Sequence, residues 1–150
     1  MVSSNIALLI CSTCRGMTGE LMHKVLAKYK ESLQVVPVDC PAETDPFVFI
    51  KMLKTNWAGI IVVCPRNACC CPKNRKVIKR REMIGDILPV FDLEKERYKV
   101  VNVSPFDFSS LDKVIEEMVE QIGLLERTRE YGQLISAMDR ELDIPQQILN

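Results

Sequence analysis

The stretch Gly59-Ile-Ile-Val-Val-Cys64-Pro-Arg-Asn-Ala-Cys69-Cys-Cys-Pro72 joins an unbroken apolar run to four of the chain's seven cysteines. An apolar run of this kind is typical of a strand buried on both faces of a parallel sheet. Strand-like runs at 6–11 and 33–40 also end on a cysteine, Cys11 and Cys40. Right-handed crossovers place the carboxyl ends of parallel strands at one edge of a sheet. We therefore expect the strand-ending cysteines to lie close together at that edge.

The rest of the chain alternates between helix-like and strand-like segments. Helical patterns are predicted at about 18–30, 45–55, 74–84 and 109–122, with a further strand at 99–104 and an irregular stretch at 88–98. Asp45-Pro46 is a typical helix start, because aspartate caps the helix and proline is tolerated at the first helical position. This alternation predicts an α/β fold with a flavodoxin-like or Rossmann-like parallel sheet of about four strands and flanking helices. We assign residues 1–126 to that domain and 127–150 to a C-terminal helical tail.

Size and composition favour a soluble single domain. The chain has 150 residues, of which 47% are hydrophobic, and its 20 basic side chains balance its 20 acidic ones. No apolar run approaches the roughly 20 residues that a membrane span needs. The amino-terminal residues lack the basic region of a signal peptide, so we expect a cytoplasmic protein. In a reducing compartment, seven cysteines indicate metal binding or catalysis rather than a disulfide framework.

Five cysteines become candidate ligands of a soft metal when the loops are included. They are the strand-ending residues together with their loop neighbours: Cys11, Cys14, Cys40, Cys64 and Cys69. Thiolates select zinc or an iron–sulfur cluster. Structural zinc usually shows two short cysteine knuckles and replaces a missing core, whereas this chain has enough apolar residues for a core. The spacing therefore favours a [2Fe–2S] cluster, which takes four thiolates, over zinc.

Two other functions fit part of the cysteine pattern. Cys11-x-x-Cys14 precedes a predicted helix, whose amino terminus would lower the pKa of a thiol, as in a thioredoxin-like dithiol oxidoreductase. That hypothesis leaves Cys40, Cys64 and Cys69 without a role. A zinc-binding interaction module is the other alternative, and zinc would leave the protein colourless.

The order of these motifs resembles a known family. Cys11-x-x-Cys14, then Cys40 with Asp45-Pro46 after it, then a strand ending in Cys64-x4-Cys69 resembles the delta subunit of methyl-viologen-reducing hydrogenase over roughly residues 5–125. The resemblance implies a flavodoxin-like domain that carries one [2Fe–2S] cluster. It implies an electron-transfer subunit rather than a stand-alone enzyme. Its partners would be a hydrogenase or formate dehydrogenase and the flavin-containing subunit of a heterodisulfide reductase.

The resemblance also implies the ligand set. All five matching cysteines are candidates, and a cluster uses four of them. Cys11 is the one that we would exclude first, because it ends a strand and its side chain can point into the core. The family's loop reads Cys-His-Pro-Gly-Asp-Cys-His, and here Cys70 stands in place of the second histidine. Cys70 and Cys71 are therefore alternative ligands.

Three further features have a structural and a functional interpretation. Six of the nine residues at 73–81 are basic, which indicates either a solvated helix face or a patch that offsets cluster charge and steers an acidic partner. Nucleic-acid binding is not expected, because no aromatic residues interleave this run. His23, the only histidine, is predicted to lie at the surface. The tail at 127–150 either packs on its own domain or docks a partner subunit.

Overall fold

The computed structural model describes residues 5–11, 20–65, 74–103 and 109–142. Within these ranges the strands and helices follow in the order β1 (Ile6–Cys11), α1 (Glu20–Lys28), β2 (Leu33–Val38), α2 (Pro46–Thr55), β3 (Gly59–Pro65), α3 (Asn74–Ile87), β4 (Tyr98–Val103) and α4 (Ser109–Leu142). The stretch predicted to be irregular holds two short 3-10 helices, η2 (Leu88–Phe91) and η3 (Lys95–Arg97). The predicted α/β alternation is confirmed.

The described strands form one parallel sheet in the order β2-β1-β3-β4. This is the flavodoxin-like order, in which the direction of winding reverses between β1 and β3. Ile10 of β1 pairs with Val63 of β3, so the next residues lie at the carboxyl edge, Cys11 as the last residue of β1 and Cys64 as the next to last of β3. The topology therefore places these two cysteines on either side of the switch point, where ligands bind in such sheets.

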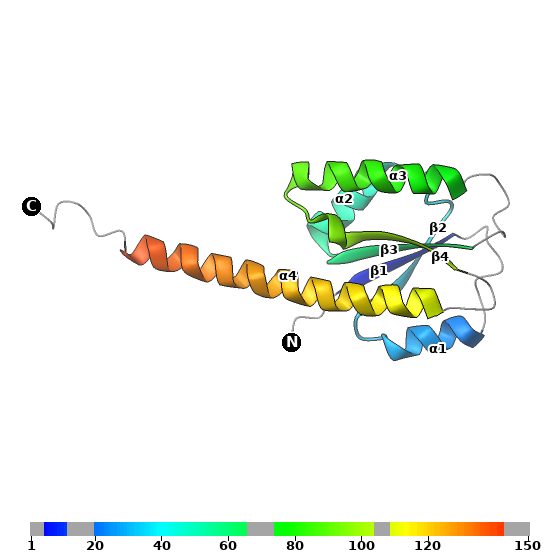
Figure 1. Cartoon of the computed structure of the whole chain (residues 1–150), viewed down its shortest axis with the longest axis horizontal. Coiled ribbons are helices and arrows are strands. Elements are labelled where there is room, and N and C mark those ends of the chain that lie inside the picture. The colour runs from blue at the N-terminus through cyan, green and yellow to red at the C-terminus, as the bar shows by residue number, and fades with distance from the viewer. Residues whose placement is uncertain (1–4, 12–19, 66–73, 104–108, 143–150) are drawn as a thin grey trace, which may run out of the picture.

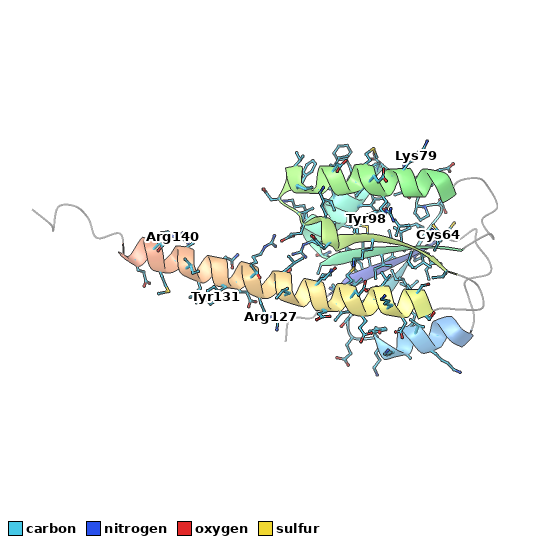
Figure 2. The ribbon with its side chains drawn as sticks, viewed as in Figure 1. Cys64, Lys79, Tyr98, Arg127, Tyr131 and Arg140 are labelled. Carbon is cyan, nitrogen blue, oxygen red and sulfur yellow. The ribbon has the colours of Figure 1, made fainter. Side chains whose placement is uncertain are left out.

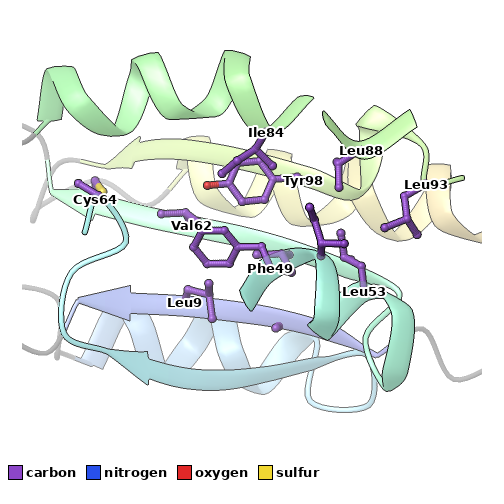
Figure 3. Close-up of a cluster of buried hydrophobic side chains, with 13 residues drawn as sticks. Leu9, Phe49, Leu53, Val62, Cys64, Ile84, Leu88, Leu93 and Tyr98 are labelled. Atoms are coloured by element: carbon purple, nitrogen blue, oxygen red, sulfur yellow. The ribbon is translucent and has the colours of Figure 1, made fainter. Parts of the chain in front are cut away.

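Helices cover both faces of the sheet (Figure 1). Helices α2 and α3 lie on one face, and their apolar side chains pack with the strands into a cluster that includes Phe49, Val62 and Tyr98 (Figure 3). Helices α1 and α4 lie on the other face, where Leu111, Ile115, Met118 and Ile122 of α4 pack on Leu8, Ile61 and Val63. Strands buried on both faces explain the continuous apolar runs in the sequence.

The second strand is shorter than predicted. We expected it to run to Cys40, but β2 ends at Val38 and Cys40 lies in the turn beyond it. The carbonyl of Cys40 accepts hydrogen bonds from the backbone amides of Glu43 and Thr44, and these bonds bend the chain out of the sheet. β2 is an edge strand, the position in a sheet where a proline such as Pro37 is tolerated.

Helix α4 extends through both segments that the sequence pattern divided. It has 34 residues and is about 51 Å long. Side chains up to Ile122 pack on the sheet, whereas every described side chain from Arg127 to Glu141 is exposed. The second half of α4 runs past the end of the sheet (Figure 1). The predicted boundary at residue 126 thus falls inside a continuous helix, and the division into two units stays a prediction.

None of the helices in the described ranges combines the length and apolar character that crossing a membrane requires.

Candidate functional site

Cys11 is part of the packed core at the carboxyl edge of the sheet. Its side chain is buried and belongs to the apolar cluster on the α1/α4 face. Its Sγ donates a hydrogen bond to the carbonyl of Asp39, with a sulfur–oxygen distance of 2.9 Å. This bond fastens the end of β1 to the turn that follows β2. Cys11 therefore has a structural role that its sequence position suggested.

Cys40 lies in the turn after β2 and contacts the apolar clusters on both faces of the sheet. It is half-buried and packs against both apolar clusters, the one that contains Cys11 and the one that contains Cys64. The Thr44 hydroxyl donates to the Cys40 carbonyl at 2.9 Å and completes the turn. Cys40 also lines an open hollow of about 460 Å³, whose other walls are Pro37, Val38, Asp39, Glu43 and Thr44. Its thiol region is thus more accessible than those of the other two described cysteines.

Cys64 is buried on the α2/α3 face next to Tyr98. In Figure 3 the Tyr98 hydroxyl points toward the end of the sheet where Cys64 lies. Burial raises the pKa of Tyr98 well above its usual range, and negative charge on Cys64 raises that pKa further, while Arg80 lowers it. Tyr98 therefore remains a neutral phenol. Because both Cys64 and Arg80 act on it, the three groups share one electrostatic environment.

Arg80 connects α3 to the turn that carries Cys40. Its guanidinium donates to the carbonyl of Thr44, and to that of Pro41 at 3.5 Å. Neighbouring Lys79 and Arg81 are exposed, and Lys79 extends from the outer surface of α3 (Figure 2). The basic run thus combines an inward residue with outward ones, a division that the sequence did not reveal. The side chains of Lys73, Arg75 and Lys76 lie outside the described set.

The structure brings Cys11, Cys40 and Cys64 to one edge of the sheet, as predicted. The remaining four predicted or alternative ligands lie outside the described residues: Cys14, Cys69, Cys70 and Cys71. Among the side chains that the structure does describe, no three histidine, cysteine, aspartate or glutamate residues form a group able to hold a metal ion. His23 is exposed on α1. The described thiols alone therefore do not make a complete metal site.

A buried arginine at the opposite edge had no signal in the sequence. The Arg97 side chain is 3% exposed, and its Nη1 donates to the carbonyl of Ala58 at 2.8 Å. It pairs with Glu94 at 2.5 Å and with Glu126 at 3.2 Å. Burial by itself would lower the pKa of Arg97, but the hydrogen bonds to both carboxylates raise it. This network joins α4 to the start of β3 where the helix leaves the sheet.

The comparison with known families agrees with this architecture. The family model described as methyl-viologen-reducing hydrogenase, delta subunit, matches residues 6–126. The chain belongs to this family. The match to the delta subunit family extends from β1 to Glu126 in α4 and includes all five predicted ligand cysteines. A hydrogenase subunit associates with hydrogenase complexes, which indicates a role in electron transfer with partner subunits. No curated protein matches the chain.

Proposed function

We propose that this delta subunit family member is an electron-transfer subunit that carries one [2Fe–2S] cluster at the carboxyl edge of its sheet. The observation that supports this most directly is the position of Cys11, Cys40 and Cys64. Three separate segments bring them to the carboxyl edge of a flavodoxin-like sheet, where Cys11 and Cys64 lie on either side of the switch point. Thiols gathered from distant sequence at such a point suit a soft-metal cofactor.

The described cysteines supply the kind of ligand that the cluster needs, and two loop cysteines would bring the number of ligands to four. A [2Fe–2S] cluster takes four thiolates. We assign Cys40, Cys64, Cys14 and Cys69 as the ligands. Cys40 lines the hollow, and Cys64 lies near the end of β3 in the same electrostatic environment as Tyr98 and Arg80. Cys14 and Cys69 enter from the family pattern, because they lie outside the described residues.

Cys11 is assigned a positioning role instead. A cysteine must lose its proton to bind a metal. The Cys11 thiol uses its proton in the bond to the Asp39 carbonyl, and a thiolate at 2.9 Å from that oxygen would be repelled. Cys11 therefore sets the position of the turn that carries Cys40, and it does so as a neutral thiol.

When bound, the cluster would supply one-electron redox chemistry. The chain's own groups set the surroundings. Arg80 and Cys64 both act electrostatically on Tyr98, so a fixed positive charge belongs to the surroundings of this site. The apolar cluster on the α2/α3 face excludes water from the Cys64 side. Tyr98, held neutral by burial, keeps a hydroxyl rather than a second negative charge near the site.

We propose as partners a hydrogenase or formate dehydrogenase on one side and a flavin-containing subunit of the heterodisulfide-reductase type on the other. The exposed cations Lys79 and Arg81 lie on α3 and would steer an acidic partner surface toward this edge. Family membership supports association with a hydrogenase complex, and these finer assignments are part of the proposal.

The test is anaerobic purification, with visible absorption and iron, sulfide and zinc analysis on one sample. We expect a brown protein with about two irons and two sulfides per chain. Colourless protein with about one zinc would refute the relay and favour a zinc-binding interaction module. Metal-free protein that resists reconstitution would favour a dithiol oxidoreductase.

Three variants test the ligand assignment. Cys40→Ala and Cys64→Ala are expected to lose most of the iron, while Cys11→Ser keeps it, because the serine hydroxyl can still donate to the Asp39 carbonyl. Circular dichroism of each variant confirms folding. Loss of iron in Cys11→Ser, with iron retained in Cys40→Ala, would show that the assignment is wrong.

A further inference from the structure

The projecting half of α4 carries an exposed apolar stripe with heptad spacing. Leu124, Thr128, Tyr131, Ile135 and Met138 follow one another at intervals of four, three, four and three residues. The side chains of Leu124, Tyr131 and Met138 are 59%, 66% and 52% exposed. Alternating intervals of three and four residues are the pattern of a coiled-coil seam, in which such positions face another helix.

This stripe lies on the side of α4 that faces away from the sheet. The residues that pack on the sheet end with Met118 and Ile122. Tyr131 follows Ile122 by nine residues, or two and a half turns, which places it about half a turn around the helix. Figure 2 shows Arg127, Tyr131 and Arg140 along the part of α4 that extends beyond the body. The domain therefore leaves the seam uncovered.

The seam contains a hollow whose lining residues have the spacing of a coiled-coil hole. A hollow of about 420 Å³ is lined by Arg127, Thr128, Tyr131, Gly132 and Ile135. The last four are spaced as i, i+3, i+4 and i+7, the four positions that surround a knob from a facing helix. Gly132 has no side chain to fill the hole. The Thr128 hydroxyl donates to the Leu124 carbonyl at 2.9 Å, so its polar group is satisfied within the helix.

We propose that α4 pairs antiparallel with α4 of a second copy of this chain, around a two-fold axis near residue 133. In this register Tyr131 faces Ile135 of the second copy and Thr128 faces Met138, so these four seam positions meet one another across the two-fold axis. Ile135 of the second copy is the knob for the hole at Gly132.

Charge complementarity selects the second copy as the occupant. In the antiparallel register Arg127 lies beside Glu141 of the second copy, and the two-fold axis repeats this pair. In a parallel pairing Arg127 would face Gly132 and lack an acidic neighbour there. Both side chains are exposed in the single chain and are free to meet a partner.

The pairing leaves the cysteine edge accessible. A Cβ built on Gly59, at the amino-terminal end of β3, would meet Ile122 and Met118 of α4, while Cys64 lies toward the other end of that strand. The helix thus leaves the body at the edge opposite the cysteines. Two paired copies would carry their cysteine edges at the outer ends, and the pairing does not depend on a bound cluster.

Sedimentation velocity of the full chain over about 1–200 µM tests the proposal. The expected mass is about twice the 17.1 kDa of one chain. Ile135→Glu is expected to give a monomer, because it buries a charge in the seam. The matched control Gln133→Glu introduces the same residue on the opposite side of the helix and should remain a dimer. A monomer at every concentration, or a dimer that survives Ile135→Glu, would overturn the proposal.

A charge exchange tests the orientation of the helices. Arg127→Glu should weaken the dimer roughly tenfold, because two exposed ion pairs become repulsive. Combining it with Glu141→Arg should restore the affinity, and failure to do so would contradict the antiparallel register. Iron analysis of the same samples separates the two proposals: a monomer with its cluster overturns the pairing alone, and a dimer without iron overturns the cluster alone.

Discussion

Replacing Arg97 with methionine is expected to destabilise the fold by about 3 kcal/mol. The guanidinium is 3% exposed and holds the Ala58 carbonyl at 2.8 Å, Glu94 at 2.5 Å and Glu126 at 3.2 Å. Ala58 comes just before β3, Glu94 comes just before η3, and Glu126 lies in α4. One cation therefore connects three elements at the point where α4 leaves the sheet.

The magnitude follows from what methionine leaves behind. It keeps much of the aliphatic volume but supplies no donor, so the Ala58 carbonyl and two carboxylates lose their partner. Removing one member of a buried ion pair costs about 3–5 kcal/mol. The carboxylate side chains of Glu94 and Glu126 are 31% and 25% exposed, so water replaces part of the lost interaction and places the value at the lower end. For a chain of this size, the melting temperature should fall by roughly 6–12 °C.

Urea unfolding followed by far-ultraviolet circular dichroism measures the effect, with both proteins at the same iron content. Lys95→Met is the matched control. Lys95 lies in the same 3-10 helix and pairs with Asp86 at 3.5 Å, but both side chains are mostly exposed. Its loss should cost less than about 0.5 kcal/mol. An Arg97→Met protein within about 1 kcal/mol of wild type would refute the reasoning.

The same pair predicts a pH dependence. Burial would raise the pKa of Glu94, but the hydrogen bond from Arg97 more than offsets this and lowers it from its ordinary value of 4.5. A carboxyl group with a lowered pKa in the folded state contributes stability above its unfolded pKa. That contribution is lost as the pH falls through the folded value. The difference between wild type and Arg97→Met should therefore be constant from about pH 6 to 8 and shrink below about pH 4.5.

Two further substitutions test packing and one tests a surface pair. Gly59→Ala should cost about 1–3 kcal/mol, because the new Cβ would lie 2.5 Å from Cδ1 of Ile122. Gly85→Ala meets no atom within 4 Å in α3 and should stabilise by about 0.5–1 kcal/mol; thermal unfolding measures both, and a destabilised Gly85→Ala would contradict the geometry. Asp112 accepts a 2.6 Å hydrogen bond from the Tyr29 hydroxyl, which lowers the pKa of Asp112. Asp112→Asn should cost about 0.5–1 kcal/mol at pH 7 and progressively less below pH 4, and an unchanged difference at pH 3 would exclude this role.

The fold could be predicted where the burial of a segment determines which of its residues are apolar. The runs at 6–11 and 59–64 are apolar throughout because both faces of β1 and β3 are covered, and the alternation of such runs with helical segments predicted the parallel sheet. The continuity of α4 was not predictable in this way. Its apolar stripe changes face between Ile122 and Leu124, and one helix with stripes on opposite faces has the same local pattern as two helices.

The candidate site was predictable to the level of topology. Parallel strands with right-handed crossovers bring Cys11, Cys64 and the turn that carries Cys40 to one edge. The bond from Cys11 to the Asp39 carbonyl and the hold of Arg80 on Thr44 join residues 28 and 36 positions apart. No local pattern encodes such contacts, so sequence reasoning could set Cys11 apart by its place at a strand end but could not identify its hydrogen-bond partner or the inward direction of Arg80.

The proposed cluster site and the proposed helix pairing lie at opposite edges of the sheet. The carboxyl edge holds the described cysteines, and the amino edge holds the Arg97 network from which α4 projects. The family match ends at Glu126, the residue that pairs with Arg97, so the shared domain coincides with the packed body. The seam beyond it adds pairing without altering the cysteine edge. If both proposals hold, Ile135→Glu should yield single chains that keep their iron, and electron transfer to one partner should then be independent of dimer formation.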